Sequence, residues 1–254
     1  VTISGFTKAV TYNISDTAAA IAAGIGSDAA VITAAINGTG TVVANTYATK
    51  AELEIIGANA NTIVFSVKDT AVNLAAATAA RILKAVNVIA TTDATVAQAT
   101  SIDTNTNAGA GGYNTYNITD SAAAIAAKTN AFLTKAQTVT VDGTADVTQA
   151  TTISGLTKAV IYSISDVAAN ALGAAATTYN EAVNITITTD VTYAQAKAID
   201  DATNTNNGGV NSYSINDTSA FFTFDGGYLT NIFYHCFRPK LSFQQLKKRI
   251  LKYY

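Results

Sequence analysis

The chain has 254 residues, of which 49% are hydrophobic and 13% are charged, and its formal net charge is −2 at pH 7. Its 15 basic residues are outnumbered by 17 acidic residues, which excludes the basic surface expected of a nucleic-acid-binding protein, and the hydrophobic fraction excludes a disordered polyelectrolyte. The sequence contains no run of about 18 strongly apolar residues that would predict a membrane span, and its single cysteine cannot form a disulfide within the chain.

The chain opens within a repeat, because residues 1–10 match residues 151–160 almost letter for letter. The first residue is a valine with no signal peptide before it. We therefore expect a processed product or a piece of a longer protein.

A strand-forming phrase followed by an alanine-rich phrase recurs along the chain, beginning at Tyr12. In each copy apolar and polar residues alternate before an aspartate, which is the period-two pattern of a strand. The run after the aspartate is rich in alanine, the residue with the highest helix propensity. The sequence therefore predicts a strand-to-helix corner at Asp16, Asp69, Asp120, Asp166 and Asp217.

A second strand–helix phrase lies between the copies of the first. It occupies residues 88–98, 139–149 and 185–195, with a degenerate copy at 42–52. Its corners are expected at Tyr47, Asp93, Thr144 and Asp190. Successive corners of the two phrases are about 25 residues apart, so the repeating unit is about 50 residues long and has two unlike halves.

The aspartate at a corner is predicted to be the N-cap of the helix that follows it. A carboxylate there accepts hydrogen bonds from the free amides of the first helical turn, which contributes about 1 kcal/mol relative to alanine, and its charge suits the positive end of the helix. The predicted structural caps are Asp16, Asp69, Asp93, Asp120, Asp166, Asp190 and Asp217.

This alternation predicts an α/β fold in which parallel strands are joined by helical crossovers. The simplest arrangement is a right-handed solenoid with one coil of about 25 residues per corner. Strands stack about 4.8 Å apart whereas helices pack about 8–10 Å apart, so we expect a curved rod. A doubly wound sheet is the alternative, but the phosphate-binding or catalytic loop expected at its switch point is not apparent.

Two runs of the chain resemble a known kind of repeat. Residues 15–23 read Ser-Asp-Thr-Ala-Ala-Ala-Ile-Ala-Ala, and residues 92–99 read Thr-Asp-Ala-Thr-Val-Ala-Gln-Ala. Together they resemble the "DTAANIAA … TVAQA" repeats of very large bacterial secreted and cell-surface proteins, including adhesin-like and matrix proteins. The resemblance covers roughly residues 1–220 and implies a spacer, fibre or adhesive array at the cell surface, with no catalytic residue to carry over.

The chain changes character near Phe221. All acidic residues lie before residue 226, whereas residues 226–254 are basic and aromatic, so we expect a repeat array over 1–220 and a separate C-terminal segment over 221–254. Phe243, Leu246 and Ile250 share one stripe of a predicted basic amphipathic helix. This segment is interpreted as a cap on the last coil, a contact with an anionic membrane or polymer, or a terminus foreign to the array.

Candidate catalytic groups are few. The only histidine, His235, is next to Cys236 in the basic segment, and the neighbouring Asp200 and Asp201 are interpreted as the end of a helix entering a turn. The sequence shows neither a zinc-ligand set nor a phosphate-binding loop, so we expect no enzymatic activity and no cofactor.

Calcium is the one ligand that the sequence suggests. Two Asn-rich loops place oxygen-bearing side chains at spaced positions before a glycine, but the glycine falls one place late and no glutamate follows at the twelfth position. Simple Asn/Gly turns are the competing interpretation. The candidate ligands are Asp103, Asn105, Asn107, Asp201, Asn204 and Asn206.

The sequence predicts a non-enzymatic structural or adhesive repeat segment of an extracellular or cell-surface filament or matrix protein. Its expected partners are neighbouring repeats or further copies of the chain, and surface polysaccharide, whereas the basic segment is expected to contact an anionic surface. One alternative is a segment of a phage or cell appendage fibre. The other is a carbohydrate-binding repeat domain, for which Tyr113, Tyr179 and Tyr193 are the candidate aromatic residues.

Overall fold

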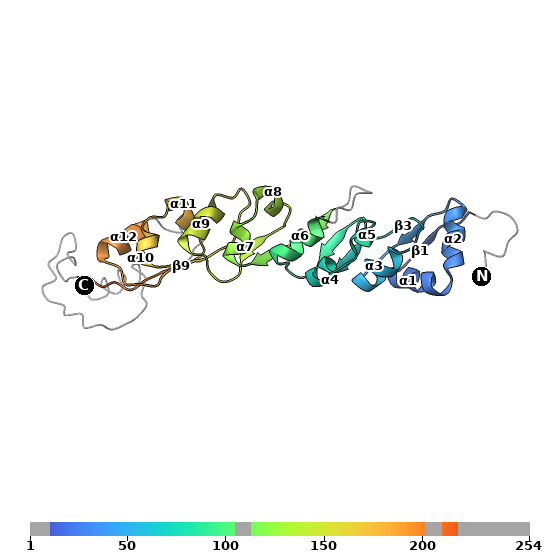
Figure 1. Ribbon diagram of the computed structural model, residues 1–254, viewed down its shortest axis with the longest axis horizontal. Coiled ribbons are helices and arrows are strands. Elements are labelled where there is room, and N and C mark those ends of the chain that lie inside the picture. The colour runs from blue at the N-terminus through green and yellow to red at the C-terminus, as the bar shows by residue number, and fades with distance from the viewer. Residues whose placement is uncertain (1–10, 105–112, 202–209, 218–254) are drawn as a thin grey trace, which may run out of the picture. The chain divides into compact units, whose positions relative to one another are not determined.

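The computed structural model describes residues 11–104, 113–201 and 210–217, apart from the side chains of Asp200 and Asp201. The chain divides into two compact units, whose described residues are 11–104, 113–119 and 134–138 in unit 1 and 120–133, 139–201 and 210–217 in unit 2. Each unit is mixed α/β, with short parallel strands and short helices (Figure 1). The predicted C-terminal segment at 221–254, with His235 and Cys236, lies outside the described residues.

The first sheet of unit 1 has three parallel strands in chain order. Ile14 lies beside Val42, and Val42 lies beside Ile63. Because the strands are parallel, the chain must cross back over the sheet between them, and helices make these crossovers. The elements are β1 (Ile14–Asp16), α1 (Ala18–Ser27), α2 (Ala29–Asn37), β2 (Val42–Ala44), α3 (Lys50–Ile56) and β3 (Ile63–Val64).

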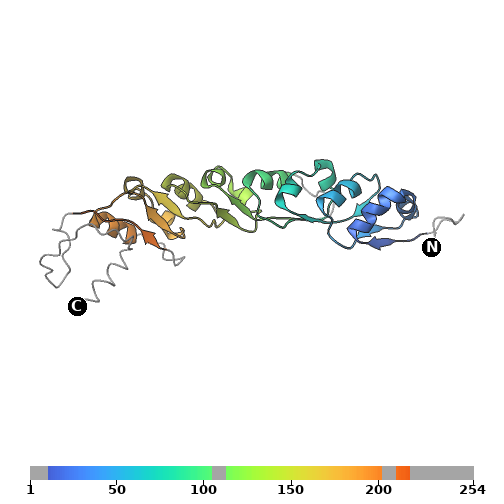
Figure 2. The ribbon, with the colours of Figure 1, turned by 90° about the horizontal axis from the view of Figure 1, so that it is seen from below.

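The second sheet of unit 1 repeats this arrangement in the order β4-β5-β6. Val67 pairs with Val88, and Val88 pairs with Asn114. The elements are β4 (Val67–Asp69), α4 (Ala71–Ala75), α5 (Ala79–Ile82), β5 (Val88–Ala90), α6 (Val96–Thr104) and β6 (Asn114–Thr115). Figure 2 shows the same alternation of short strands and short helices from a second direction.

Unit 2 contains a third sheet of the same kind, in the order β11-β10-β9. Ile164 pairs with Ile185, and Ile185 pairs with Asn211. Its elements are β9 (Ile164–Asp166), α10 (Ala168–Ala171), α11 (Ala176–Asn180), β10 (Ile185–Ile187), α12 (Tyr193–Asp201) and β11 (Asn211–Ser212). The preceding elements of the chain are β7 (Ile118–Asp120), α7 (Ala122–Ala126), α8 (Asn130–Leu133), β8 (Val139–Val141) and α9 (Val147–Ser154).

Isolated parallel bridges, each formed by a single pair of residues, lie outside the strand pairs described above. A buried residue that follows each second-phrase strand pairs with the next first-phrase strand region. These bridges are Ala48 with Val67, Ala94 with Ile118, Ala145 with Ile164 and Val191 with Ile215. The first-phrase strands β4 and β9 are therefore paired on both edges.

The core of each unit consists of one strand face and one stripe of each helix. Strand residues such as Val42 and Ile164 are fully buried, as are helix residues such as Leu53 and Ala150. Alanine on the helices allows them to approach the sheet closely because it adds almost no side-chain bulk. The aromatic residue of the first phrase is also buried at Phe65, Tyr116, Tyr162 and Tyr213.

The prediction of an α/β fold with parallel strands and helical crossovers is confirmed. The described sheets have two or three strands each and none closes on itself. The expectation of one helix per corner is wrong for the first phrase, where two helices follow the strand, as α4 and α5 do. The second helix α5 has its own N-cap residue, Thr78, whose N–H donates a 2.8 Å hydrogen bond to Oε1 of Glu54.

Among the described residues, no single helix has the length and apolar composition needed to cross a membrane. Helices α1 and α2 reach these limits only when they are taken together, and they meet at an angle of 105°.

Candidate functional site

The first-phrase aspartates share one local geometry. Oδ1 of each accepts a hydrogen bond of 2.7 Å from the N–H of the next residue in the chain. The pairs are Asp16 with Thr17, Asp69 with Thr70, Asp120 with Ser121 and Asp166 with Val167. This bond orients the carboxylate and leaves Oδ2 to make a different contact.

The prediction that these aspartates are helix N-caps is wrong by one residue. Asp16 pairs with Ala44, so the strand continues through the aspartate and the helix begins after it. The caps of α1, α4 and α7 are the hydroxyls of Thr17, Thr70 and Ser121. At α10 the position after Asp166 is Val167, which has no side-chain acceptor.

The second-phrase helices also have caps that differ from the prediction. Thr95 and Thr192, two residues after Asp93 and Asp190, accept from the third amide beyond them. At α9 the cap is Asp146, two residues after the expected corner at Thr144. The sequence signal that identifies these caps is the capping box, in which a Thr or Asp precedes Glu or Gln by three residues. It occurs at Thr49–Glu52, Thr95–Gln98, Asp146–Gln149 and Thr192–Gln195.

Oδ2 of a first-phrase aspartate caps the helix before it, not the helix after it. The first helical N–H of α3, α9 and α12 donates to an aspartate of the next strand region. The pairs are Lys50 to Asp69 at 2.8 Å, Val147 to Asp166 at 2.9 Å and Tyr193 to Asp217 at 2.8 Å. A free amide at a helix N-terminus is thus satisfied by a residue from the following segment.

The first-phrase helices use threonine in the same way. The first helical N–H of each donates at 3.0 Å to a threonine that follows the next strand. The pairs are Ala18 to Thr46, Ala71 to Thr92 and Ala168 to Thr189. At these corners, a side chain therefore accepts a hydrogen bond from the first amide of the helix at the preceding corner.

The charge of the capping aspartates depends on these contacts. Burial alone raises the pKa of Asp69, but hydrogen bonds from Lys50, Asn73 and Thr70 outweigh it and lower the pKa below the ordinary 3.8. The pKa of Asp166 is lowered in the same way, because hydrogen bonds from Val147, Asn170 and Val167 outweigh burial. Both carboxylates are therefore ionised at neutral pH.

Asp93 and Asp190 contact the next strand region. Asp93 accepts from Asn117 Nδ2 at 3.2 Å and from the Thr119 hydroxyl at 2.8 Å. Asp190 accepts from Asn216 Nδ2 at 3.5 Å. Their role is to connect neighbouring strand regions and not to cap a helix.

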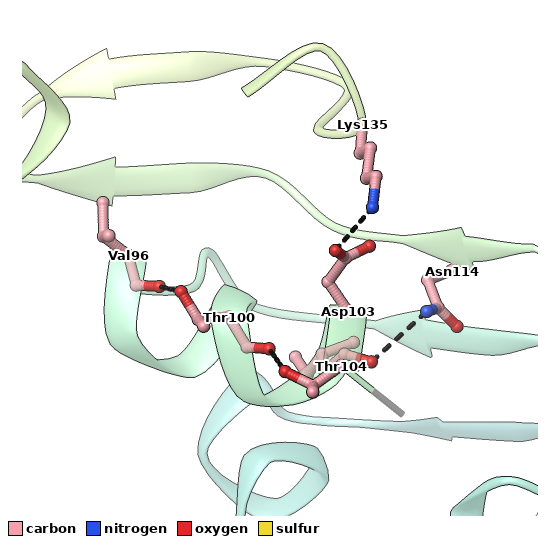
Figure 3. A network of polar contacts seen from close by, with 7 residues as sticks. Val96, Thr100, Asp103, Thr104, Asn114 and Lys135 are labelled. Atoms are coloured by element: carbon pink, nitrogen blue, oxygen red, sulfur yellow. Dashed lines mark hydrogen bonds and ion pairs between the residues drawn. The ribbon is translucent and has the colours of Figure 1, made fainter. Parts of the chain in front are cut away.

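The calcium candidate Asp103 already has a cationic partner. Its Oδ2 accepts a 2.7 Å hydrogen bond from Nζ of Lys135, and Asn114 Nδ2 donates to Ile102 O at 3.2 Å beside it (Figure 3). The side chain of Asp201 and the residues Asn105, Asn107, Asn204 and Asn206 lie outside the described residues. Over the ranges that the structure describes, no group of three or more His, Cys, Asp or Glu side chains could hold a metal ion.

The tyrosines proposed for carbohydrate contact have different environments. Tyr113 is 58% exposed, whereas Tyr179 is buried and its hydroxyl donates to Ala171 O. Tyr193 is partly buried at the start of α12. The structure also shows an exposed aromatic residue, Tyr47, which the sequence placed at a corner but not among the carbohydrate candidates; its ring centroid lies 5.8 Å from Nζ of Lys68.

Two buried tyrosines at the same repeat position differ in their hydrogen bonding. The Tyr162 hydroxyl donates to Thr178 O at 2.8 Å. The Tyr116 hydroxyl is buried and has no hydrogen-bond partner among the described residues. Burial, with a smaller contribution from the charge of Asp103, raises the pKa of Tyr116 to about 12.

One face of unit 1 contains an apolar hollow of about 170 Å³. It lies between β1, α1 and α2. Its lining includes Ile14, Asp16, Ala20, Ile21, Val31 and Ile32.

The contacts described above hold successive segments to one another, and no reactive constellation emerges from the described residues. No protein-family model, no curated protein and no solved structure matches the chain. Any function must therefore be proposed from the geometry of the corners and of the surfaces around them.

Proposed function

We propose that the chain is a non-enzymatic structural or adhesive repeat segment of an extracellular or cell-surface filament or matrix protein. Neighbouring repeats and further copies of the chain are its first partners, and surface polysaccharide is a second. The basic segment at 221–254 contacts an anionic surface or covers the end of the array.

The observation that supports this proposal most strongly is the repeated bond between a helix amide and the next aspartate. It joins Lys50 to Asp69, Val147 to Asp166 and Tyr193 to Asp217 with nearly the same length. The same hydrogen bond thus forms between segments of different sequence. This suits a protein that extends by repetition, because each segment is joined to the next by the same contact.

The finer fold belongs to the same proposal. We propose that the units form a right-handed solenoid of about 25 residues per coil and about 50 per two-coil repeat, curved because helices need more room than strands. Parallel pairing with single bridges such as Ala48 to Val67 supports this arrangement, since β4 then lies beside both the segment that precedes it and β5, which follows it.

The experiment is electron microscopy of the purified chain and of the chain in its natural context. A slender particle in isolation and a position within a filament or matrix would support the proposal. A compact globular particle, or a chain that is never part of an extracellular or surface assembly, would contradict it. Trimers or head-to-tail fibres on a phage or appendage would favour the fibre alternative.

A carbohydrate-binding domain is the second candidate, and the exposed ring of Tyr113 favours it. Exposed aromatic rings can stack on sugar rings. Binding of the chain to surface polysaccharide, lost on Tyr113→Ala and kept on Tyr179→Phe, would support it. Equal binding by both variants would remove Tyr113 from the site.

A further inference from the structure

Asp16 lacks the contact that other first-phrase aspartates make. Its Oδ1 accepts from Thr17 N–H at 2.7 Å, as at the equivalent corners. Oδ2 of Asp69, Asp166 and Asp217 then accepts the first N–H of a preceding helix. Oδ2 of Asp16 accepts no hydrogen bond from any described residue, although the carboxylate has the same orientation.

Among the residues that the structure describes, the backbone edge beside Asp16 also has no partner. The Ile14 N–H donates to Thr41 O toward β2, so the next amide, that of Ser15, faces the opposite edge. At β4 the equivalent edge is filled: the Lys68 N–H donates to Ala48 O at 2.9 Å, and Ser66 O accepts from Ala48 N–H at 2.8 Å. At β9 Ala145 makes the same two bonds.

The hollow continues this open edge with apolar surface. Its apolar lining residues are Ile14, Ala20, Ile21, Val31 and Ile32, and Asp16, Gly24 and Asp28 also line it. In unit 2 the equivalent place is occupied, because α9 packs against β9 and α11. The face of α9 that is buried there consists of Val147, Ala150 and Ile153.

We propose that the surface formed by β1, α1 and α2 is a docking site for one more strand–helix segment of the second phrase. The occupant bridges Ile14 with a small residue equivalent to Ala145, donates its first helical N–H to Oδ2 of Asp16, and fills the hollow with a face equivalent to Val147, Ala150 and Ile153. The inference rests on the proposed repeat function. It identifies a second-phrase segment as the partner of this surface.

The repeat pattern of the chain favours an occupant that is joined to β1 through residues 1–10. Residues 1–10 have almost the sequence of residues 151–160, which in unit 2 run from the last turns of α9 toward β9. A second-phrase segment joined through residues 1–10 therefore has the same linker length to β1 that α9 has to β9.

The test fuses a second copy of residues 139–150 directly before Val1 of the full chain. We expect the Ser15 amide to exchange with solvent at least about tenfold more slowly, because it gains a backbone acceptor. The thermal midpoint should rise by about 2–4 °C or more. No change in either measurement would overturn the proposal.

Two variants of the fused chain test the carboxylate contact. Asp16→Ala removes the acceptor. Val147→Pro in the fused copy removes only the donor, since proline is tolerated at the first helical position and leaves the rest of the helix in place. Both should lose part of the gain in midpoint, and an unchanged gain in both would show that Asp16 does not take part.

A peptide of residues 139–160, added to the unfused chain, tests the source of the occupant. Protection of Ser15 by the free peptide at micromolar concentration, equal to that in the fusion, would overturn the assignment to the same polypeptide and favour a second chain. Electron microscopy of the unfused chain reports on the repeat function independently. Failure of the docking site is therefore distinguishable from failure of the proposed function.

Discussion

The Lys50 backbone N–H donates a 2.8 Å hydrogen bond to Oδ2 of Asp69, a residue 19 positions later in the chain. Lys50 is the first residue of α3, and Asp69 is the last residue of β4. Helix α3 therefore depends on a carboxylate that belongs to the next corner. This dependence makes the stability of one segment sensitive to substitutions in another.

Asp69→Ala should destabilise the chain by about 1–2 kcal/mol, because it removes the acceptor for a helix amide and a negative charge at a helix N-terminus. Asp142→Ala is the matched control. Asp142 is exposed and its carboxylate has no hydrogen bond from a described residue, so this change should stay within about 0.5 kcal/mol. Urea unfolding of the two variants measures the difference, and equal losses would contradict the capping role.

The capping aspartates should make the fold sensitive to acid. The pKa values of Asp69 and Asp166 are lower in the folded chain than their ordinary 3.8, so the folded state binds fewer protons than the unfolded state. Their contribution to stability is therefore present above pH 3.8 and is lost as the pH falls through the folded pKa values. Urea midpoints at pH 7 and pH 3 should differ less in the Asp69→Ala, Asp166→Ala double variant than in the parent chain.

Tyr162→Phe and Tyr116→Phe should have different effects although both residues occupy the same repeat position. Tyr162→Phe leaves Thr178 O without its buried donor and should cost about 1–3 kcal/mol. Tyr116→Phe removes a buried hydroxyl that has no partner in the described structure, so it should be neutral or stabilising. Thermal melts of the two variants test this, and a larger loss for Tyr116→Phe would be the contrary result.

Alkaline pH should act through Tyr116. Burial raises its pKa from 10.0 to about 12, so the folded chain holds the proton more strongly than the unfolded chain does. The corresponding stability is complete below pH 10.0 and is lost as the pH rises toward 12. An ultraviolet titration of tyrosinate should show a late step to which Tyr179 also contributes, because burial raises its pKa to about 12 as well, and this step should be smaller in Tyr116→Phe.

Gly40→Ala should be strongly destabilising, whereas Gly26→Ala should not. A Cβ at residue 40 would lie 1.9 Å from Tyr12 O, and that backbone atom cannot move without displacing the segment that leads into β1. A Cβ at residue 26 in α1 meets nothing within 4 Å, and alanine there favours the helix by about 0.5–1 kcal/mol. Circular dichroism melts of both variants provide the comparison.

The positions of the strands and the residues on their buried faces could be predicted from the sequence, because they follow from the alternation of apolar residues. The strand residues Val67 and Ile164 are buried where the period-two pattern places them. The exact caps could not be derived from the aspartates, because Asp16 and Asp69 are the last residues of their strands and the caps are the residues that follow them. A capping-box search would have found Thr49 and Thr95.

The contacts between segments were beyond sequence reasoning for a physical reason. Local sequence patterns indicate which residues can cap a helix. They do not indicate that Lys50 and Asp69, 19 residues apart, are in contact, because the crossover and the register of the sheet bring them together. The second helix of the first phrase was also missed, and at α5 its N-cap residue Thr78 likewise contacts a residue that is distant in sequence, Glu54 of α3. The open carboxylate of Asp16 also becomes visible only when the corners are compared in space.

The direction of the capping bonds has a consequence for biosynthesis. A chain emerges from the ribosome from its N-terminus, so α3 is complete in sequence before its acceptor Asp69 has been made. The same order holds for α9 with Asp166 and for α12 with Asp217. Each of these helices therefore gains the protein acceptor for its first amide only after the following corner has been synthesised, so this contribution to its stability comes about one segment later in translation.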